Sequence, residues 1–434
     1  MDTSRTGSTI SAGGATGVGL ASLVGGATSY LVFLVAARVL DQESNALFLV
    51  FWSLLFWSFG TIGGLQNEVT RAVRSATATS TATSPTIDAT GTTGPTGRLP
   101  ARSGAAVVPV SLALGGGAAL VAAISSPLWG ERLLGAPWPW LVLVLGVSLV
   151  TFAGHSAMCG ALAGRGAWSA YSTLVAAEAT TRLALVLLAA AAGGVLLGLE
   201  AAAGLAAATW VLLVAVDRRS RAAFGARADV PAGVFVGHVG HAVLASSASA
   251  ALVVGFTVLL KITSTHEAVV AATPFILAIS LTRAPLLIPL SAYQGVAITY
   301  FLEHRTEGLR SLARVGGYIL GGGLLAALAA AAVGPWLMRT LFGPGYGVTG
   351  AWLGALTLVG SLLALLTLTG AAVLALGEHR RYSAGWVAAT LVALALLLTP
   401  LSLELRTILS LGAGPLVGIA VHAAALRRPA RADR

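Results

Sequence analysis

Glu178 and Arg182 stand four residues apart within an apolar stretch, and the acidic residue comes first. This order and spacing place both side chains on one face of a helix, where they can form an ion pair. An unpaired arginine near the centre of a bilayer costs at least about 2.5 kcal/mol, so its side of the helix must meet protein or water. The pair could lock two helices together, or the guanidinium could exchange its carboxylate partner for a phosphate. Both interpretations fit the sequence.

Arg283 is a second basic residue inside an apolar stretch, with Pro274 before it and Pro285 and Pro289 after it. Several prolines in one helix free backbone carbonyls and permit bending, which membrane proteins tolerate where a helix lines a cavity. We therefore expect this segment to be a moving element and Arg283 to be a cavity cation. The alternative is that Arg283, close to the predicted cytoplasmic end, extends its side chain to water.

A polar group ends another apolar stretch at Gln66, Glu68 and Arg71, on or near one side of the expected helix. These residues could form a mouth that receives headgroups, or a plain interfacial cap. Gln294, near the inner end of the stretch that holds Arg283, allows the same two interpretations. The predicted substrate-binding residues are Arg182, Glu178, Arg283, Gln66, Glu68, Arg71 and Gln294.

The sequence offers little for metal or covalent chemistry. His238 and His241 are three residues apart, but no acidic residue or cysteine accompanies them at ligand spacing, so helix packing is the favoured interpretation. Glu200 lies inside an apolar stretch and is a candidate coupling carboxylate. No loop collects paired carboxylates or metal ligands. We expect no enzyme activity, no cofactor and no metal.

The elements that must position these residues are membrane spans. With 56% hydrophobic and 10% charged residues and a mean hydropathy of +0.86, the 434-residue chain has too little polar surface for a soluble globule. About twelve apolar stretches approach the roughly 20 residues that a bilayer crossing requires. The predicted spans are residues 11–36, 45–64, 104–128, 140–161, 170–192, 195–216, 232–260, 268–289, 313–337, 350–376, 383–401 and 407–425.

Most of the 26 basic residues fall in segments that are cytoplasmic if the N-terminus is inside. Both termini are therefore predicted to face the cytoplasm, and the protein is predicted to lie in the inner cell membrane. Short basic loops beside spans are explained by orientation and by anionic headgroups, so the net charge of +10 does not indicate nucleic acid. Abundant Ala, Gly and Arg suggest a bacterial, GC-rich genome.

The basic segment 217–231 divides the chain into halves of six predicted spans, residues 1–216 and 232–434. Segment 75–103, rich in Ser, Thr, Gly and Pro, is predicted to be a flexible cytoplasmic loop. Duplicated bundles around a central cavity are a common transporter plan. The predicted fold is an all-α polytopic membrane protein with two six-helix lobes.

Four short segments, in this order, resemble the polysaccharide flippase branch of the multidrug/oligosaccharidyl-lipid/polysaccharide exporter superfamily. They are Ala36–Leu40, Gln66–Arg71, Arg283–Leu286 and Leu341–Tyr346. The sequence departs from that branch after Leu40, where Asp-Gln-Glu-Ser-Asn-Ala replaces the usual Gly-Pro-Glu-Glu-Phe-Gly-like turn.

This resemblance implies two lobes that open alternately to either side and carry a lipid-linked oligosaccharide or polysaccharide precursor across the cytoplasmic membrane. The implied partners are the polyprenyl-linked glycan, membrane lipids and glycan-assembly proteins. The alternative is a cation-coupled multidrug exporter of the same superfamily, which should need a central carboxylate. It comes second because no Asp occurs within a predicted span. A membrane enzyme of glycan or lipid assembly is disfavoured because no loop collects paired carboxylates or metal ligands.

Overall fold

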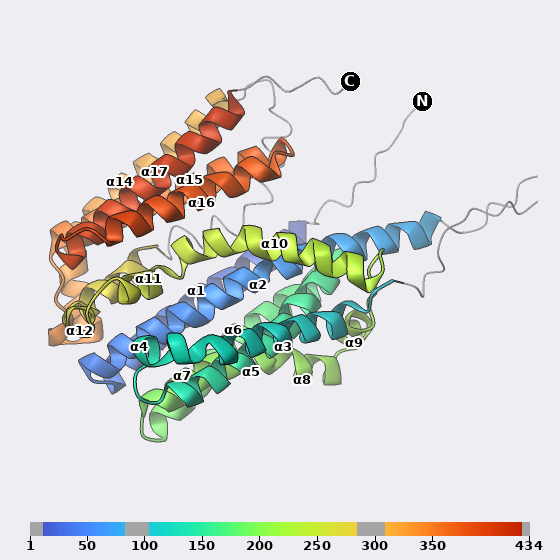
Figure 1. Ribbon diagram of the computed structural model, residues 1–434, viewed down its shortest axis with the longest axis horizontal. Coiled ribbons are helices and arrows are strands. Elements are labelled where there is room, and N and C mark those ends of the chain that lie inside the picture. Colours follow the sequence, from blue (N-terminus) through green and yellow to red (C-terminus); the bar gives the residue numbers. More distant parts are fainter. Residues whose placement is uncertain (1–11, 83–103, 284–308, 428–434) are drawn as a thin grey trace, which may run out of the picture.

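The computed structural model describes residues 12–82, 104–283 and 309–427, and within these ranges the chain forms helices and no β-strand. Figure 1 shows two helical bundles, with α10 (Ala232–Val253) running between them. A helix satisfies its backbone N–H and C=O groups internally, which a bilayer requires of any segment that crosses it. The predicted all-α fold class is confirmed.

The first bundle is built around α2 (Gln42–Ala82), a 41-residue helix that packs against α5 (Trp138–Gly164) and α10. Gly160 and Gly164 of α5 lie against Val69 and Val73 of α2, so the two backbones approach closely. The other helices of this bundle are α1 (Ala12–Val39), α3 (Val107–Ser125), α4 (Gly130–Leu134), α6 (Trp168–Ala191), α7 (Leu196–Leu205), α8 (Thr209–Val216) and α9 (Arg218–Phe224).

The second bundle pairs α14 with α15 and α16 with α17. After α10 the chain continues through two short helices and a helical segment at residues 273–283 before it reaches this bundle. A π-helical turn, η3, and a 3-10 turn, η4, follow α14. The bounds are α11 (Phe256–Ile262), α12 (His266–Ala271), α14 (Leu309–Leu337), η3 (Met338–Phe342), η4 (Pro344–Tyr346), α15 (Gly350–Ala375), α16 (His379–Leu397) and α17 (Leu403–Leu426).

Ten helices among the described residues are long and apolar enough to cross a membrane. They account for the predicted spans except the eighth and the eleventh. The eleventh coincides with α16, which has 19 residues, and the eighth is described only as far as residue 283. A polytopic protein of about twelve helices is therefore consistent with the structure.

Several predicted boundaries need correction. Helix α2 continues to Ala82, so residues 75–82 of the predicted flexible loop are helical, and the rest of that loop lies outside the described residues. The sixth span is interrupted between α7 and α8 by the 3-10 turn η2 (Ala206–Ala208), and the seventh breaks at residues 254–255. The predicted linker 217–231 contains α9. These breaks expose backbone groups that other residues must satisfy.

The two bundles are hydrogen-bonded to each other at the end of the molecule that carries the α1–α2 turn. Arg38 Nε and Nη2 donate to the carbonyl oxygens of Leu341 and Thr340 at 2.6 and 2.7 Å, and Asn45 Nδ2 donates to Tyr346 Oη at 2.7 Å. These five residues define the closed end. From there the axes of α14–α17 diverge from those of α1 and α2 toward the opposite end, the terminal end, where α1 begins and α17 finishes (Figure 1).

Candidate functional site

Arg182 lies inside the first bundle on α6 and is 6% exposed. Its Nη2 donates to Glu178 Oε1, and its Nε donates to the carbonyl oxygen of Ala203 at 3.1 Å. The guanidinium carbon lies 4.8 Å from the centre of the Phe56 ring and 5.9 Å from that of Trp52. The ion pair expected from the four-residue spacing is therefore present. A carboxylate and two aromatic faces together stabilise the buried positive charge.

Arg283 lies where α10 breaks from α11 and is 5% exposed. Its Nη1 donates to the carbonyl oxygens of Leu252 and Val253 at 3.3 and 3.4 Å, and its guanidinium carbon lies 5.1 Å from the centre of the Phe256 ring. Nη2 is buried and has no hydrogen-bond partner among the described residues, nor does any described carboxylate form an ion pair with this side chain. Arg283 therefore caps carbonyls at the end of α10 and does not extend to water.

Arg182 and α10, whose end Arg283 caps, contact different faces of α2. The rings of Trp52 and Phe56 contact the Arg182 guanidinium. The next residues along the helix, Ser53 and Trp57, donate to the carbonyl oxygens of Val254 and Ser247, at and near the end of α10. One residue along an α-helix corresponds to about 100° of rotation. Arg182 and the end of α10 that Arg283 caps thus lie near the same level of α2 but on different sides of it. The structure does not bring them together in one site.

Glu68 and Arg71 contact each other in a cluster on the part of α2 that lies toward the terminal end of the molecule. Arg71 Nη2 lies 2.6 Å from Glu68 Oε1, Arg71 Nη1 lies 3.1 Å from Asp229 Oδ2, and His238 Nδ1 lies 3.2 Å from Glu68 Oε1. Burial raises the pKa of Asp229, but hydrogen bonds from Arg71 and Ser75 outweigh it and leave that pKa below its ordinary value. The cluster ties α2 to α10 and to the segment before it.

The other residues of the predicted mouth are not part of this cluster. Gln66 Nε2 donates to Tyr171 Oη of α6 at 3.4 Å, on another side of α2. Gln294 lies outside the described residues, as do Pro285 and Pro289. The structure therefore joins two of the three residues at the end of the second predicted span and separates the third.

Glu200 of α7 is fully buried, and neither of its carboxylate oxygens has a hydrogen-bond partner among the described residues. An ionised carboxylate in such a place is costly, so this group is suited to hold a proton.

His422 has partners on two other helices. Its Nδ1 lies 2.9 Å from Thr369 Oγ1 and its Nε2 lies 3.1 Å from the Tyr382 carbonyl oxygen, so this side chain joins three helices. Within the described ranges, no group of three or more His, Cys, Asp or Glu could hold a metal ion.

Two sets of contacts were not predicted from the sequence. The aromatic residues beside Arg182 recur every third or fourth residue from Phe48 to Phe59, and this local spacing was a usable signal. The contact between Asn45 and Tyr346 joins residues 301 positions apart, and no local pattern reports it. Asn45 belongs to the turn that departs from the flippase pattern, so this departure lies at the closed end.

No protein-family model matches the chain. The chain is 40% identical to the uncharacterized protein Rv1510 of Mycobacterium tuberculosis (strain H37Rv), over 97% of its own length and 93% of that protein. It is 39% identical to the uncharacterized protein Mb3654 of Mycobacterium bovis, over 97% of its own length and 94% of that protein. These matches cover both bundles.

The structure is similar to solved transporters of the MOP superfamily. An inward-facing multidrug resistance transporter of the MATE family aligns with a TM-score of 0.66 and 16% identity, over 94% of this chain and 97% of that one. A MOP superfamily transporter from Pyrococcus furiosus, described as having a binding pocket of reverse polarity, aligns with a TM-score of 0.66 and 15% identity, over 96% of each chain. An outward-facing MATE structure aligns with a TM-score of 0.62 and 16% identity, over 94% of this chain and 93% of that one. The chain thus has the fold of MOP-superfamily transporters, and it belongs to the same protein family as the mycobacterial proteins Rv1510 and Mb3654.

Proposed function

We propose that this protein carries its substrate across the cytoplasmic membrane by alternating access. The observation that supports this most is that α14–α17 and the turn after α14 are hydrogen-bonded to α1 and α2 through Arg38 and Asn45 at the closed end, whereas α14–α17 diverge from α1 and α2 toward the terminal end. Two bundles joined at one end can exchange that contact for one at the other end. Solved structures of this fold include inward-facing and outward-facing states. The distribution of arginines supports a cytoplasmic position for the terminal end, and with that orientation the arrangement would be inward-open.

The substrate that we propose is a polyprenyl-linked oligosaccharide or polysaccharide precursor. Three of the four segments that resemble the flippase branch supply contacts at the junctions between moving parts: Arg38 and Tyr346 at the closed end, and Arg283 at the break after α10. Arg283 also has an unpartnered donor, Nη2, and no carboxylate neighbour among the described residues. Such a guanidinium can bind a phosphate of the lipid carrier once the bundles move.

The second candidate function is cation-coupled export of drugs, and Glu200 is the observation that favours it. A buried carboxylate without a partner can take up and release a proton as its surroundings change. Glu200 lies in α7 of the first bundle, fully buried. In a flippase, Glu200 would couple proton movement to transport and would not recognise the cargo. Glu200 alone therefore does not distinguish a flippase from a drug exporter.

The substrate is tested first in cells. Deletion of the gene should leave lipid-linked glycan intermediates on the cytoplasmic leaflet and deplete a surface polysaccharide. The purified protein in vesicles should move such a lipid between leaflets. If deletion leaves every surface glycan intact and raises sensitivity to cationic drugs, the flippase proposal is wrong and the exporter replaces it.

Alternating access is tested at the closed end. Asn45→Cys combined with Tyr346→Cys, linked by a short bis-methanethiosulfonate that forms a disulfide with each cysteine, should stop transport in vesicles, and a reductant that cleaves these disulfides should restore it. The chain's one native cysteine, Cys159, is buried, so it should not compete for the reagent. Each single variant with the same reagent is the control. Full transport by the linked protein would contradict this mechanism.

A further inference from the structure

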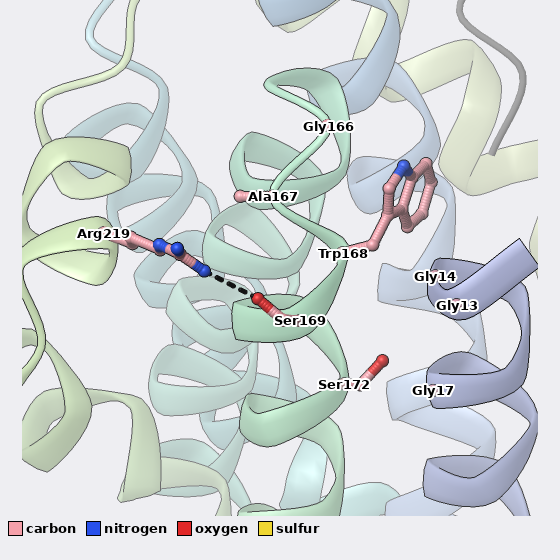
Figure 2. A pocket seen from close by; sticks show the side chains of 9 residues that line it. All are labelled: Gly13, Gly14, Gly17, Gly166, Ala167, Trp168, Ser169, Ser172 and Arg219. Carbon is pink, nitrogen blue, oxygen red and sulfur yellow. Dashed lines mark hydrogen bonds between the residues drawn. The ribbon is translucent and has the colours of Figure 1, made fainter. Parts of the chain in front are cut away.

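A cavity of about 650 Å³ opens in the first bundle near the terminal end, between the first turns of α1, the start of α6 and α9 (Figure 2). Arg219 of α9 and Ser169 of α6 are hydrogen-bonded to each other in its lining, and Trp168 and Ser172 stand on the side of α6 that faces α1. None of these residues takes part in the closed end or contacts the two buried arginines. The cavity is therefore separate from the proposed transport machinery.

The polar side chains that line this cavity can all donate hydrogen bonds. Arg219 Nη1 donates to Ser169 Oγ at 2.7 Å, which leaves the Ser169 hydroxyl proton and the rest of the guanidinium for a ligand. Ser172 Oγ is buried and has no hydrogen-bond partner among the described residues. No Asp or Glu among the described residues lines the cavity. A lining of donors with a positive charge suits an anion, and a guanidinium matches the oxygens of a phosphate.

The acidic residue nearest along the chain, Asp217, directs its carboxylate to Ser220. Its Oδ2 accepts from the backbone N–H and the hydroxyl of Ser220 at 2.7 and 2.8 Å, and these hydrogen bonds lower its pKa below the ordinary value. It begins α9 as the N-cap residue. The positive charge of Arg219 also lowers the pKa of Asp217, but no described ion pair joins the two side chains, so the guanidinium can still bind an external anion.

Glycines of α1 keep the cavity open. A methyl group added at Gly13 would meet nothing within 4 Å, and one at Gly17 would lie 3.1 Å from Ser172 Oγ. Leu20 lies on the same face of α1 as these glycines, one turn further into the span, and is 58% exposed. The wall therefore changes from bare backbone beside the donors to an exposed apolar side chain deeper in the membrane.

The position of the cavity along the spans points to a lipid. The first span begins at Gly13, the span of α6 begins at Trp168, and the span before α9 ends at Val216. Three spans thus leave the hydrocarbon here, at the level of the headgroups, where tryptophan is enriched and exposed basic side chains attract acidic lipids. A phosphate bound by Arg219 would leave its acyl chains beside Leu20.

We propose that this cavity binds the phosphate headgroup of an acidic phospholipid from the leaflet at the terminal end. Arg219 and Ser169 hold the phosphate, and the acyl chains lie along α1. The site does not depend on the proposed function, because a flippase and an exporter could carry it equally well.

The test is the thermal stability of the full-length purified protein in a neutral detergent, measured against added phosphatidylglycerol. We expect phosphatidylglycerol to raise the melting temperature in a saturable way and phosphatidylcholine not to. Arg219→Ala should raise the half-saturating concentration at least about tenfold, which corresponds to the loss of a charge-assisted contact. Arg221→Ala is the matched control, because Arg221 is also exposed on α9 but does not line the cavity, and it should titrate like the wild type.

A second pair of variants separates the cavity from its charge. Gly13→Leu should fill the space and weaken the effect of phosphatidylglycerol without removing a donor. Gly19→Leu is its control, since a side chain at Gly19 also meets nothing within 4 Å and Gly19 does not line the cavity. Because all four variants are compared by their lipid-dependent shift, a variant that is merely less stable still gives an answer.

Three results would overturn the proposal. Equal loss in Arg219→Ala and Arg221→Ala would reduce the effect to general attraction of a basic surface. Equal shifts in Gly13→Leu and Gly19→Leu would show that the cavity is not the site. If inorganic phosphate or glycerol phosphate stabilises the protein as well as phosphatidylglycerol does at the same concentration, the ligand is a free phosphate and not a lipid.

Discussion

Arg182 and Arg283 are both almost fully buried within predicted membrane spans, yet their surroundings differ in kind. Arg182 has a carboxylate partner, a carbonyl oxygen and two aromatic faces. Arg283 has two carbonyl oxygens and one aromatic face, and one of its nitrogens is buried without a partner among the described residues. The first cation is neutralised within its own helix. The second is only solvated, by the end of α10.

This difference indicates different roles for Arg182 and Arg283, although the sequence predicts both as basic residues that bind substrate within a membrane span. A neutralised pair offers an anionic ligand little net charge unless its carboxylate moves away. A cation that is held by carbonyl dipoles keeps its charge and has a donor to spare. We therefore expect Arg182 to stabilise the first bundle and Arg283 to contact cargo, and the following variants test that assignment.

The largest expected effect is on stability, from Arg182→Ala. Removing one partner of a buried ion pair leaves Glu178 uncompensated, which typically costs about 3–5 kcal/mol of the free energy of unfolding. The double variant Glu178→Ala with Arg182→Ala should recover most of that loss, as measured by denaturation in detergent. A stable Arg182→Ala protein that cannot transport, with a double variant that is equally inactive, would make Arg182 a cargo ligand and break the comparison.

The next effect is on transport, from Arg283→Gln. Losing a charge-assisted hydrogen bond to a phosphate should cost about 1.5–3 kcal/mol, or roughly 10- to 100-fold in transport rate. The melting temperature should fall less than in Arg182→Ala, because only neutral carbonyl oxygens lose a donor and no described carboxylate loses a partner. Arg283→Lys, which keeps the charge, should retain more activity than Arg283→Gln. Equal rates for the glutamine variant and the wild type would remove Arg283 from the cargo site.

A smaller effect is expected at the closed end, where the contact between Asn45 and Tyr346 is a neutral hydrogen bond. Asn45→Ala should destabilise the state in which the closed end is joined by about 1 kcal/mol. This changes the ratio of that state to the state open at this end roughly fivefold. Labelling of single cysteines near the closed end in vesicles measures that ratio. Tyr346→Phe should give the same shift, and the double variant should add nothing further. Additive effects would mean that the two residues act separately.

The smallest effect is expected for Arg71, the water-exposed counterpart of Arg182. Its side chain is 46% exposed, so Arg71→Ala should cost about 0.2–1 kcal/mol. Because the pKa of Asp229 is lowered, its contribution is present above the ordinary value of 3.8 and is lost as the pH falls through the lowered pKa. Melting temperatures of wild type and Arg71→Ala should therefore converge in acid. A constant difference down to low pH would exclude the Asp229 contact as its cause.

The sequence alone determined the features that depend on local properties. The length of each apolar stretch predicted the membrane helices, because a bilayer sets that length. The spacing of Glu178 and Arg182 predicted their contact, because residues four apart on a helix are neighbours. The same rule links Glu68 to Arg71, three residues apart, in the folded protein. These features require no knowledge of how the helices are arranged.

Only the tertiary structure decided which side of each helix faces which neighbour. The helices are apolar on nearly all sides, so the sequence gives little indication of their rotation or register. The break after α10, the carbonyls that receive Arg283, and the separation of Arg182 from Arg283 by α2 depend on that packing. The closed end and the cavity beside Arg219 bring together segments that are distant in the chain. Local spacing specifies contacts within a helix, and the packing of whole helices specifies the rest.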